Sequence, residues 1–516
     1  MPSEQNDLQA TLMAVRLAKR EVLDALADVP AAFDAHMAAV FAEVGGLGAA
    51  AAAVQQQQLQ QAARGESGSS GDSSSGGGGA PSALPPNLAV LLAAAAEDGG
   101  GGNGTARAER LRIFRRNLRA VRAQNERSGD TLAFGMTPFT HMTVSEFRAA
   151  YLAPDMPRLR KQEPIAKAEA AAATSAAVDG GGGARRLFQS GGNALQCSRQ
   201  VGFPAAAAGA SPLPAAFDWR DVGGRSYVTR VKNQGSCGSC AAFAVAVAYE
   251  AAVMRKYSDR GYTADRTDLS EQRFLACWPG DQCRGALPHW YADLAACKGV
   301  AFEADWPYAN VDRDSCPATT PTRFASGAAS WAYAPTNPAG YARAIVQNPL
   351  PFGLSAGGSN AFMNYKAGVF DCKHASAAQV DHAVTLVGWN DAVQMSNGQT
   401  WGVFVAKNRC VPGPPPPRGA ALFCFAVPLL RLRPPPRARR PRSPLFPLSL
   451  SSNSLPRPFL PSNSLTLTAT HAANSWSTNW GEAGFFRVRK DCTPTSTSKG
   501  PLSMYRAGYA TAILMA

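Results

Sequence analysis

Apolar and polar positions follow two different periods in different parts of the chain. Residues 241–254 contain no Gly or Pro and are apolar on nearly every face, with Glu250 as their only charge, which predicts a buried helix. Residues 384–389, 400–406 and 484–489 are short runs rich in β-branched or aromatic side chains and bounded by Gly, Asn or Asp, which predicts antiparallel strands. The pattern therefore predicts an α+β fold in which a helical part precedes a strand part.

The N-terminal third has a separate organisation. Residues 8–44 are helix-forming and amphipathic, so we expect a helical N-terminal segment over 1–48. Residues 49–104 are of low complexity in Ala, Gln, Ser and Gly, which cannot bury enough apolar surface to fold and predicts a linker. Between Arg110 and Asn125 apolar residues and two amides recur at helical spacing. Periodicity alone makes that stretch an ordinary basic amphipathic helix.

A Gly- and Ser-rich loop over residues 234–239 precedes the buried helix and places Cys240 in its first turn. Unpaired backbone N–H groups and the positive end of the helix dipole favour a thiolate there. Gln234, six residues earlier, can supply a side-chain amide as an oxyanion donor. Taken alone, Cys237 and Cys240 are equally explained as a CxxC metal or redox pair, or as two buried thiols.

Two more groups follow in an informative order. His382 lies in an apolar strand context over residues 380–384, and the tripeptide Asn-Ser-Trp at 474–476 comes after it. A lone histidine in a strand is usually a core residue. Here the order of thiol, imidazole and amide along the chain indicates a nucleophile, a base and an orienting group.

Several motifs resemble one family. The matching stretches are the spaced residues of 110–125, Gly-Met-Thr-Pro-Phe-Thr-His-Met-Thr at 135–143, the loop before Cys240 and the motif around His382. They are similar to those of papain-like cysteine proteases of the cathepsin L type, which carry an inhibitory propeptide. The resemblance runs from residue 106 to the C-terminus apart from one insert. It implies a papain-like two-domain fold, with a helical left domain and an antiparallel β-barrel right domain, preceded by a helical propeptide.

The resemblance also implies domain boundaries. These are an I29-like inhibitor propeptide at 105–155, a flexible cleavable linker at 156–212 and a peptidase domain at 213–516, with a disordered Pro/Arg-rich insert at 409–473.

The implied activity is thiol-dependent peptide-bond hydrolysis through an acyl-enzyme, without a metal or organic cofactor. Cys240 and His382 would form a thiolate–imidazolium pair, with Asn474 orienting the ring. Gln234 and the backbone N–H of Cys240 would stabilise the oxyanion, and Trp476 would shield the His–Asn hydrogen bond. Implied disulfides are Cys237–Cys283, Cys277–Cys316 and, as a third pair, Cys372–Cys492. A Cys-rich zinc site is the alternative, although the spacing is irregular and no second CxxC follows.

The insert separates Lys407-Asn408 from Asn474-Ser475-Trp476, which are continuous in the family as Lys-Asn-Ser-Trp. Codons for residues 409–411 and 474–475 can spell splice-donor and splice-acceptor strings, and joining Asn408 to Ser475 restores the motif. We therefore expect a retained intron, in which case Asn408 takes the orienting role. A genuine loop that binds nucleic acid through its arginines is the alternative, but no aromatic residue is interleaved among them for base stacking.

Four departures from the family pattern bear on function. Ala241 follows the cysteine where the family has Trp, and Arg284-Gly285-Ala286 stands for Asn-Gly-Gly, so Ala286 is expected to narrow the cleft. In the second propeptide motif, Thr137 and His141 replace Asn and Asp. Because histidine titrates near neutrality, His141 changes the expected pH response of the propeptide.

Composition refines the picture. The net charge is +14, but nine arginines in 409–457 account for nine of these charges, which leaves +5 elsewhere. Eleven cysteines, an odd number, fit disulfide pairs plus one reactive thiol and an oxidising compartment. Residues 1–26 are too charged for a signal peptide, so lysosomal, vacuolar or secreted localisation rests on the resemblance alone.

The expected partners are protein or peptide substrates and the chain's own propeptide as inhibitor. No nucleic acid, no membrane span and a monomeric state are expected. Three functions remain open at this stage. They are a zymogen endopeptidase, a transpeptidase or ligase on the same site, and a catalytically inactive papain-like binding protein.

Overall fold

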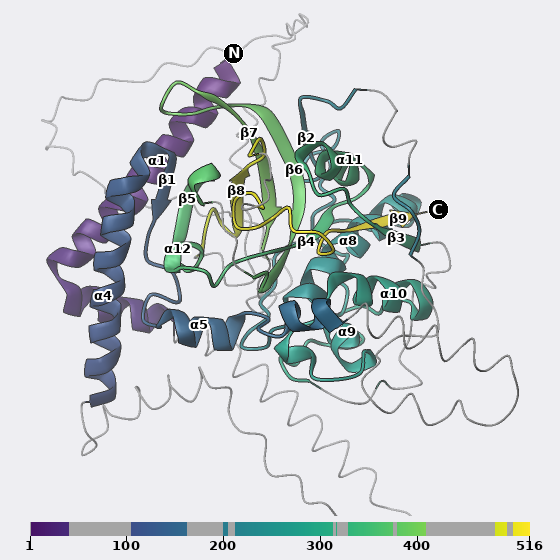
Figure 1. Ribbon diagram of the computed structural model, residues 1–516, viewed down its shortest axis with the longest axis horizontal. Coiled ribbons are helices and arrows are strands. Elements are labelled where there is room, and N and C mark those ends of the chain that lie inside the picture. The colour runs from purple at the N-terminus through teal and green to yellow at the C-terminus, as the bar shows by residue number, and fades with distance from the viewer. Residues whose placement is uncertain are drawn as a thin grey trace, which may run out of the picture. The chain divides into compact units, whose positions relative to one another are not determined.

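The computed structural model combines a helical region with a mixed sheet (Figure 1). The structure describes residues 2–40, 105–162, 200–204, 212–312, 316, 329–374, 379–408, 480–492 and 499–515. The predicted linker at 49–104, most of the cleavable linker and the insert at 409–473 lie outside the described residues. The predicted α+β class is confirmed.

The buried helix predicted from residues 241–254 is α8, Cys240–Lys256. Every residue from Cys240 to Met254 is buried, as expected for a helix apolar on all faces. Its single internal charge is neutralised locally, because the Glu250 carboxylate accepts hydrogen bonds from the Thr229 hydroxyl (2.6 Å) and the Leu269 N–H (3.0 Å). The helix therefore presents its N-terminus, with Cys240, at a fixed place in the core.

The strand part is built around one long strand. β6 (His382–Gln394) pairs antiparallel with β7 (Thr400–Lys407), which pairs antiparallel with β8 (Phe485–Arg489). β5 (Tyr365–Phe370) pairs with β8 in parallel, so the sheet differs from the expected all-antiparallel one at this position. β4 (Leu350–Leu354) pairs with β6 and places Leu354 opposite His382. The first residue of β6 is thus set by its pairing with β4.

The other elements of the peptidase region cover α8 and the sheet. Strand β2 pairs with β6, and β9 pairs with β3 in a separate two-stranded sheet. Their bounds are β2 Ala216–Asp218, η5 Ser258–Arg260, α9 Glu271–Cys277, η6 Gln282–Arg284, α10 Pro288–Lys298, β3 Ala329–Tyr333, α11 Pro338–Gln347, α12 Asn360–Met363, η7 Cys372–His374 and β9 Thr511–Met515.

The predicted basic helix is α4, Thr105–Ser128, and it belongs to a small folded unit. After it come η2 (Gly129–Thr131), β1 (Leu132–Phe134) and α5 (Val144–Tyr151). The two amides at helical spacing hold this unit together. Asn117 donates to the carbonyls of Thr140 (2.8 Å) and Met142 (2.7 Å), while Asn125 both donates to and accepts from the backbone of Phe134 (2.8 Å each). β1 then extends the sheet by pairing antiparallel with β5.

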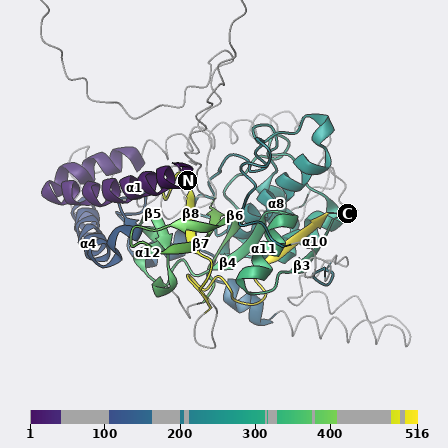
Figure 2. The same ribbon diagram turned by 90° about the horizontal axis from the view of Figure 1, so that it is seen from above.

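The N-terminal segment is helical, as predicted, but it is interrupted. α1 (Pro2–Ala27) ends at Asp28, and residues 29–40 resume as helix. The break falls just before Pro30, which lacks an N–H and fits the first turn of a new helix, where Asp28 accepts from the Ala31 N–H (3.2 Å). α1 lies beside α4 and β5, as both Figure 1 and Figure 2 show.

Three disulfides staple the described part of the chain. Cys237 is bonded to Cys283, Cys277 to Cys316 and Cys372 to Cys492, which are the pairs that the resemblance implied. Among the described residues no group of three or more His, Cys, Asp or Glu side chains could hold a metal ion. No helix in the described ranges combines the length and apolarity needed to cross a membrane.

Candidate active site

Cys240 is the first residue of α8 and its thiol is buried. The Cys237–Cys283 disulfide and a hydrogen bond from the Gly238 N–H to the Cys283 carbonyl (2.7 Å) fix the loop before it. A side chain at residue 238 is excluded, since a Cβ there would lie 2.5 Å from that carbonyl oxygen. The Cys240 Sγ accepts a hydrogen bond from the Ala383 N–H (3.3 Å), which places the sulfur beside the residue that follows His382. Cys240 is also the free thiol among the described cysteines.

His382 is fully buried, and its partner is an asparagine from the next strand. The distance between His382 Nε2 and Asn408 Oδ1 is 3.0 Å. β6 and β7 bring these residues together, because His382 begins β6 and Asn408 follows the last residue of β7. Phe362 lies beside the imidazole at 6.0 Å between ring centroids, with Trp480 packed on Phe362 at 4.9 Å.

The first-choice orienting residue, Asn474, and the shielding residue, Trp476, lie outside the described residues. The sequence offered a signal for one of the two aromatic residues near the imidazole. Trp480 is four positions after Trp476 in an aromatic-rich run, whereas Phe362 stands in a stretch without a recognisable motif.

The charge state of the site differs from the expected ion pair. Burial raises the pKa of the Cys240 thiol to about 12, although the N–H groups of Ala383 and Ala241 oppose this. Burial also lowers the pKa of His382 to about 4, against the stabilising hydrogen bond to Asn408. Desolvation disfavours both charged forms. In this covered state the site therefore favours a neutral thiol and a neutral imidazole over a thiolate–imidazolium pair.

Gln234 is fully buried next to the nucleophile loop. Its side-chain Nε2 donates to the carbonyl of Cys237 (2.9 Å) and to the carbonyl of Tyr151 (3.0 Å). The second acceptor is the last residue of α5, and it begins the segment 151–156, in a region that the sequence assigned to the propeptide. A carbonyl oxygen of that segment thus occupies the donor that was expected to bind an oxyanion.

A charged cluster that carries no sequence motif lies close to Gln234 in the chain. Lys232 is buried two residues before it, with its ammonium 2.7 Å from the Glu271 carboxylate and in contact with Asp268. Such a cluster ties the loop to α9 through charge-assisted hydrogen bonds. In the sequence this cluster shows only as a lysine two positions before Gln234, and a lysine at that spacing matches no motif.

Residues 151–156 run along the site and cover it. The Ala153 N–H donates to the carbonyl of Asp381 (2.8 Å), the residue before His382, and the Asp155 N–H donates to the carbonyl of Arg284 (3.1 Å). Ala153 also sits against Gly285, where an added Cβ would come within 2.7 Å of it. The segment therefore makes backbone contacts with both walls beside Cys240.

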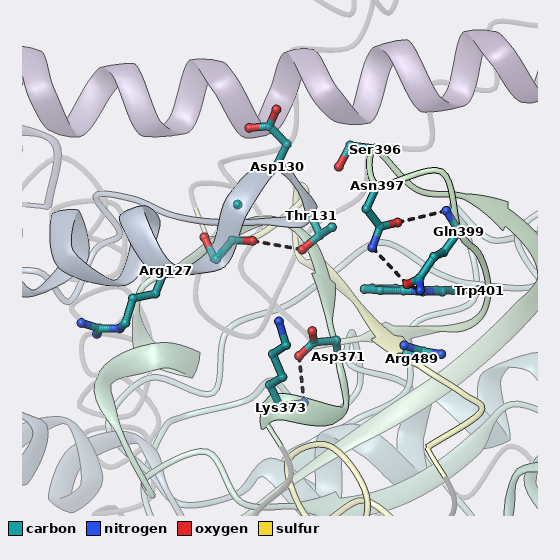
Figure 3. Close-up of a pocket in the computed structure, with 12 residues that line it drawn as sticks. Arg127, Asp130, Thr131, Asp371, Lys373, Ser396, Asn397, Gln399, Trp401 and Arg489 are labelled. Atoms are coloured by element: carbon teal, nitrogen blue, oxygen red, sulfur yellow. Dashed lines mark hydrogen bonds between the residues drawn. The ribbon is translucent and has the colours of Figure 1, made fainter.

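Two cavities clarify where a ligand could act. A small enclosed cavity of about 10 Å³ lies beneath Cys240 and Asn408, with room for about one water molecule at most. A larger cavity, about 820 Å³, lies elsewhere, between residues 127–131 and the β6–β7 loop (Figure 3). Its lining includes Trp401 and Arg489, whose guanidinium stacks 4.4 Å from the ring centroid, and no residue of the Cys240 site.

Comparison with known families matches both parts of this arrangement. Residues 213–408 match the family described as "Papain family cysteine protease", and residues 103–147 match the "Cathepsin propeptide inhibitor domain (I29)". The first match holds Gln234, Cys240, His382 and Asn408. Residues 213–408 therefore form a papain-family cysteine protease domain, the domain of a cysteine-type endopeptidase, and residues 103–147 belong to a propeptide inhibitor domain.

Relatives of the chain come from plants and animals. Ananain of Ananas comosus is 28% identical over 303 residues, which cover 57% of this chain and 73% of ananain. Cysteine proteinase RD21A of Arabidopsis thaliana is 28% identical over 57% of this chain and 55% of its own length, and cathepsin F of Drosophila melanogaster is 28% identical over 58% and 42%. The chain thus spans about half the length of several of the curated relatives that it matches.

Solved structures show the same fold. The recombinant stem bromelain precursor has a TM-score of 0.50 at 20% identity, covering 84% of this chain and 99% of its own. The digestive procathepsin L2 proteinase from the Tenebrio molitor larval midgut has a TM-score of 0.50 at 18% identity, covering 83% and 99%. Both are precursors, so the papain-like fold preceded by a propeptide is shared.

Proposed function

We propose that the chain is the zymogen of a thiol-dependent endopeptidase in which Cys240 is the nucleophile, His382 the proton carrier and Asn408 the residue that orients the imidazole. The observation that carries this assignment is the 3.0 Å hydrogen bond between His382 and Asn408 directly beside the Cys240 thiol. Asn474 is the competing orienting residue. It is separated from Asn408 by the insert and lies outside the described residues.

The covered state supports inhibition by the chain's own propeptide. Residues 151–156 contact both walls of the site and engage the Gln234 amide, so a substrate carbonyl cannot reach it while they remain. Their departure admits water, and hydration lowers the cost of charging both the thiol and the imidazole. The proton then moves from Cys240 to His382, which creates the thiolate–imidazolium pair only in the processed enzyme.

The proposed reaction follows from the positions of these groups. The Cys240 thiolate attacks the scissile carbonyl carbon, and the resulting oxyanion accepts hydrogen bonds from the Gln234 amide and the Cys240 N–H. The C–N bond breaks as His382 gives its proton to the leaving amine, which leaves a thioester. His382 next takes a proton from water, whose oxygen attacks the thioester, and the thiolate is released. No step requires a metal or organic cofactor.

We infer protein or peptide substrates and a vacuolar, lysosomal or secreted location. The three disulfides support an oxidising route, since such bonds persist outside the reducing cytosol. A monomeric enzyme is sufficient for this chemistry, because every group in the proposed site comes from one chain.

The proposal is tested on acid-processed protein treated with a thiol-directed irreversible inhibitor, with Cys240→Ala as the comparison. We expect labelling of Cys240, cleavage of peptides by the unmodified enzyme, and no cleavage by Cys240→Ala. Equal cleavage by both proteins, with Cys240 unlabelled, would rule out the protease assignment. Labelling without cleavage would favour the inactive binding protein, and new peptide bonds formed with an added amine would favour a ligase.

A tryptic peptide that crosses residue 408 decides the fate of the insert. A peptide that joins Asn408 directly to Ser475 would identify the insert as an intron and remove Asn474 from the protein. Peptides from within 409–473 would instead keep both asparagines in competition.

A further inference from the structure

The inference concerns Arg284, which stands beside the cleft where the propeptide segment passes. Three contacts join Arg284 to a single propeptide residue. The Asp155 N–H donates to the Arg284 carbonyl (3.1 Å), and the guanidinium makes a two-pronged contact with the Asp155 carboxylate, Nε to Oδ2 at 3.0 Å and Nη2 to Oδ1 at 3.3 Å. Together these contacts define a subsite for an acidic side chain. The backbone hydrogen bond fixes where the bound residue lies, and the ion pair is made from that position.

Arg284 is held at a fixed place relative to the nucleophile. It ends the short helix η6 and follows Cys283, which is disulfide-bonded to Cys237, three residues before Cys240. On its other side Gly285 has a φ of +118° and contacts Ala153, so a side chain at that position is disfavoured. The backbone of Arg284 is therefore fixed beside the nucleophile loop, and the guanidinium extends from that fixed point.

Departure of the propeptide changes the charge of this wall. Asp155 is the residue whose hydrogen bond and charge raise the pKa of Arg284 most, with a smaller contribution from Asp281. In turn, the Arg284 hydrogen bond lowers the pKa of Asp155, so the carboxylate stays ionised in mild acid. Once residues 151–156 have left, a guanidinium faces the cleft at the place where a carboxylate was bound.

We propose that the Arg284 guanidinium makes the processed enzyme prefer substrates with Asp or Glu. The preference applies at the one substrate position whose side chain reaches the place that the Asp155 carboxylate occupied in the zymogen. The proposal rests on the proposed endopeptidase function and specifies its substrate class. Because the Arg284 side chain is 57% exposed, solvent and salt screen the interaction, and a preference of roughly threefold to fivefold over a neutral isostere is expected.

The test uses a set of fluorogenic peptides in which each of the four positions on either side of the scissile bond is Asp, Asn or Lys in turn. The wild-type processed enzyme is expected to show a higher kcat/KM for Asp at one position. Arg284→Gln should abolish that preference, and Arg284→Glu should replace it with a preference for Lys. Arg266→Gln, at an exposed arginine of the same region, is the matched control and should behave as wild type.

The outcomes separate this inference from the function on which it rests. An enzyme that cleaves peptides but shows no acidic preference, or one that keeps it in Arg284→Gln, overturns the role of Arg284 and leaves the protease assignment intact. If no peptide is cleaved, the protease assignment is in question, and the subsite is measured by binding. A labelled peptide of residues 148–160 should then bind the processed protein more tightly than its Asp155→Asn form, and equal affinity overturns the inference.

Discussion

At the scale of single residues, two amide side chains decide how well the proposed site works. Asn408 contacts the imidazole and Gln234 contacts a carbonyl of the covering segment. Neither amide reacts. Asn408 acts by holding the imidazole, and Gln234 acts by stabilising the charge of the oxyanion. Substituting them is therefore expected to change kcat more than substrate binding.

Asn408→Ala is the sharper of the two tests at the His382 ring. Loss of the 3.0 Å hydrogen bond lets the imidazole rotate, and we expect kcat to fall about 10- to 100-fold with KM little changed. Steady-state kinetics of the processed enzyme measure this effect. Asn474→Ala serves as the control and should behave as wild type, and a loss of activity confined to Asn474→Ala would transfer the orienting role to that residue.

Gln234→Ala removes the proposed oxyanion donor. Loss of one such donor is expected to lower kcat on the order of 100- to 1000-fold. The control is Gln272→Ala, because Gln272 is also buried and donates to the Val311 carbonyl (3.0 Å), away from the nucleophile. Both variants should lose thermal stability, but only Gln234→Ala should lose kcat when measured well below its unfolding temperature. Similar kcat values for the two would exclude the oxyanion role.

At the scale of elements, the propeptide unit depends on hydrogen bonds between a helix and a strand. Asn125 of α4 satisfies both the N–H and the carbonyl of Phe134 at the end of β1, which in turn pairs with β5 of the peptidase sheet. An unsatisfied buried backbone group costs free energy. One side chain therefore links the stability of the propeptide to its contact with the enzyme.

Asn125→Ala should weaken this link. Two buried backbone groups lose their partners, and we expect the free energy of unfolding of the propeptide unit to fall by about 2–4 kcal/mol. Cys240 should then be alkylated faster in the unprocessed protein at neutral pH. Arg122→Ala, on the exposed face of the same helix, removes only a surface pair with Glu126 and should leave the alkylation rate unchanged. An unchanged rate in Asn125→Ala would contradict the proposed link.

At the scale of the whole molecule, local patterns predicted the elements, and only tertiary contacts defined the site. The apolar run 241–254 and the short runs of β-branched and aromatic residues were visible because each is a local feature of the sequence. The parallel pairing of β5 with β8 was not, since pairing direction depends on segments far apart in the chain. The burial that keeps Cys240 and His382 neutral was also hidden, because it arises when a separate segment covers them.

A pair of histidines joins the N-terminal helical segment to the propeptide unit. His36 Nε2 lies 3.0 Å from His141 Nδ1, so one ring donates a hydrogen bond to the other. His141 is buried, and the half-buried His36 packs against Phe114. Burial, then the neighbouring His141 and Lys366, lowers the pKa of His36 to about 3. Burial and Arg110 lower the pKa of His141 to about 4, with Glu146 opposing.

These shifts make the contact sensitive to acid. In the unfolded chain histidines protonate as the pH falls below their ordinary pKa of 6.5, whereas in the folded chain His36 and His141 resist protonation until about pH 4 or lower. The stability of the folded contact is therefore complete above pH 6.5 and falls as the pH drops toward 4. Between pH 6.5 and 5 the loss is on the order of 2 kcal/mol per histidine. The protection factors of residues 29–40 against hydrogen exchange, which correct for the slower chemical exchange in acid, should therefore fall in this range. His141→Asn should flatten the response and His374→Asn should preserve it, whereas an unchanged response in His141→Asn would place the acid sensitivity elsewhere.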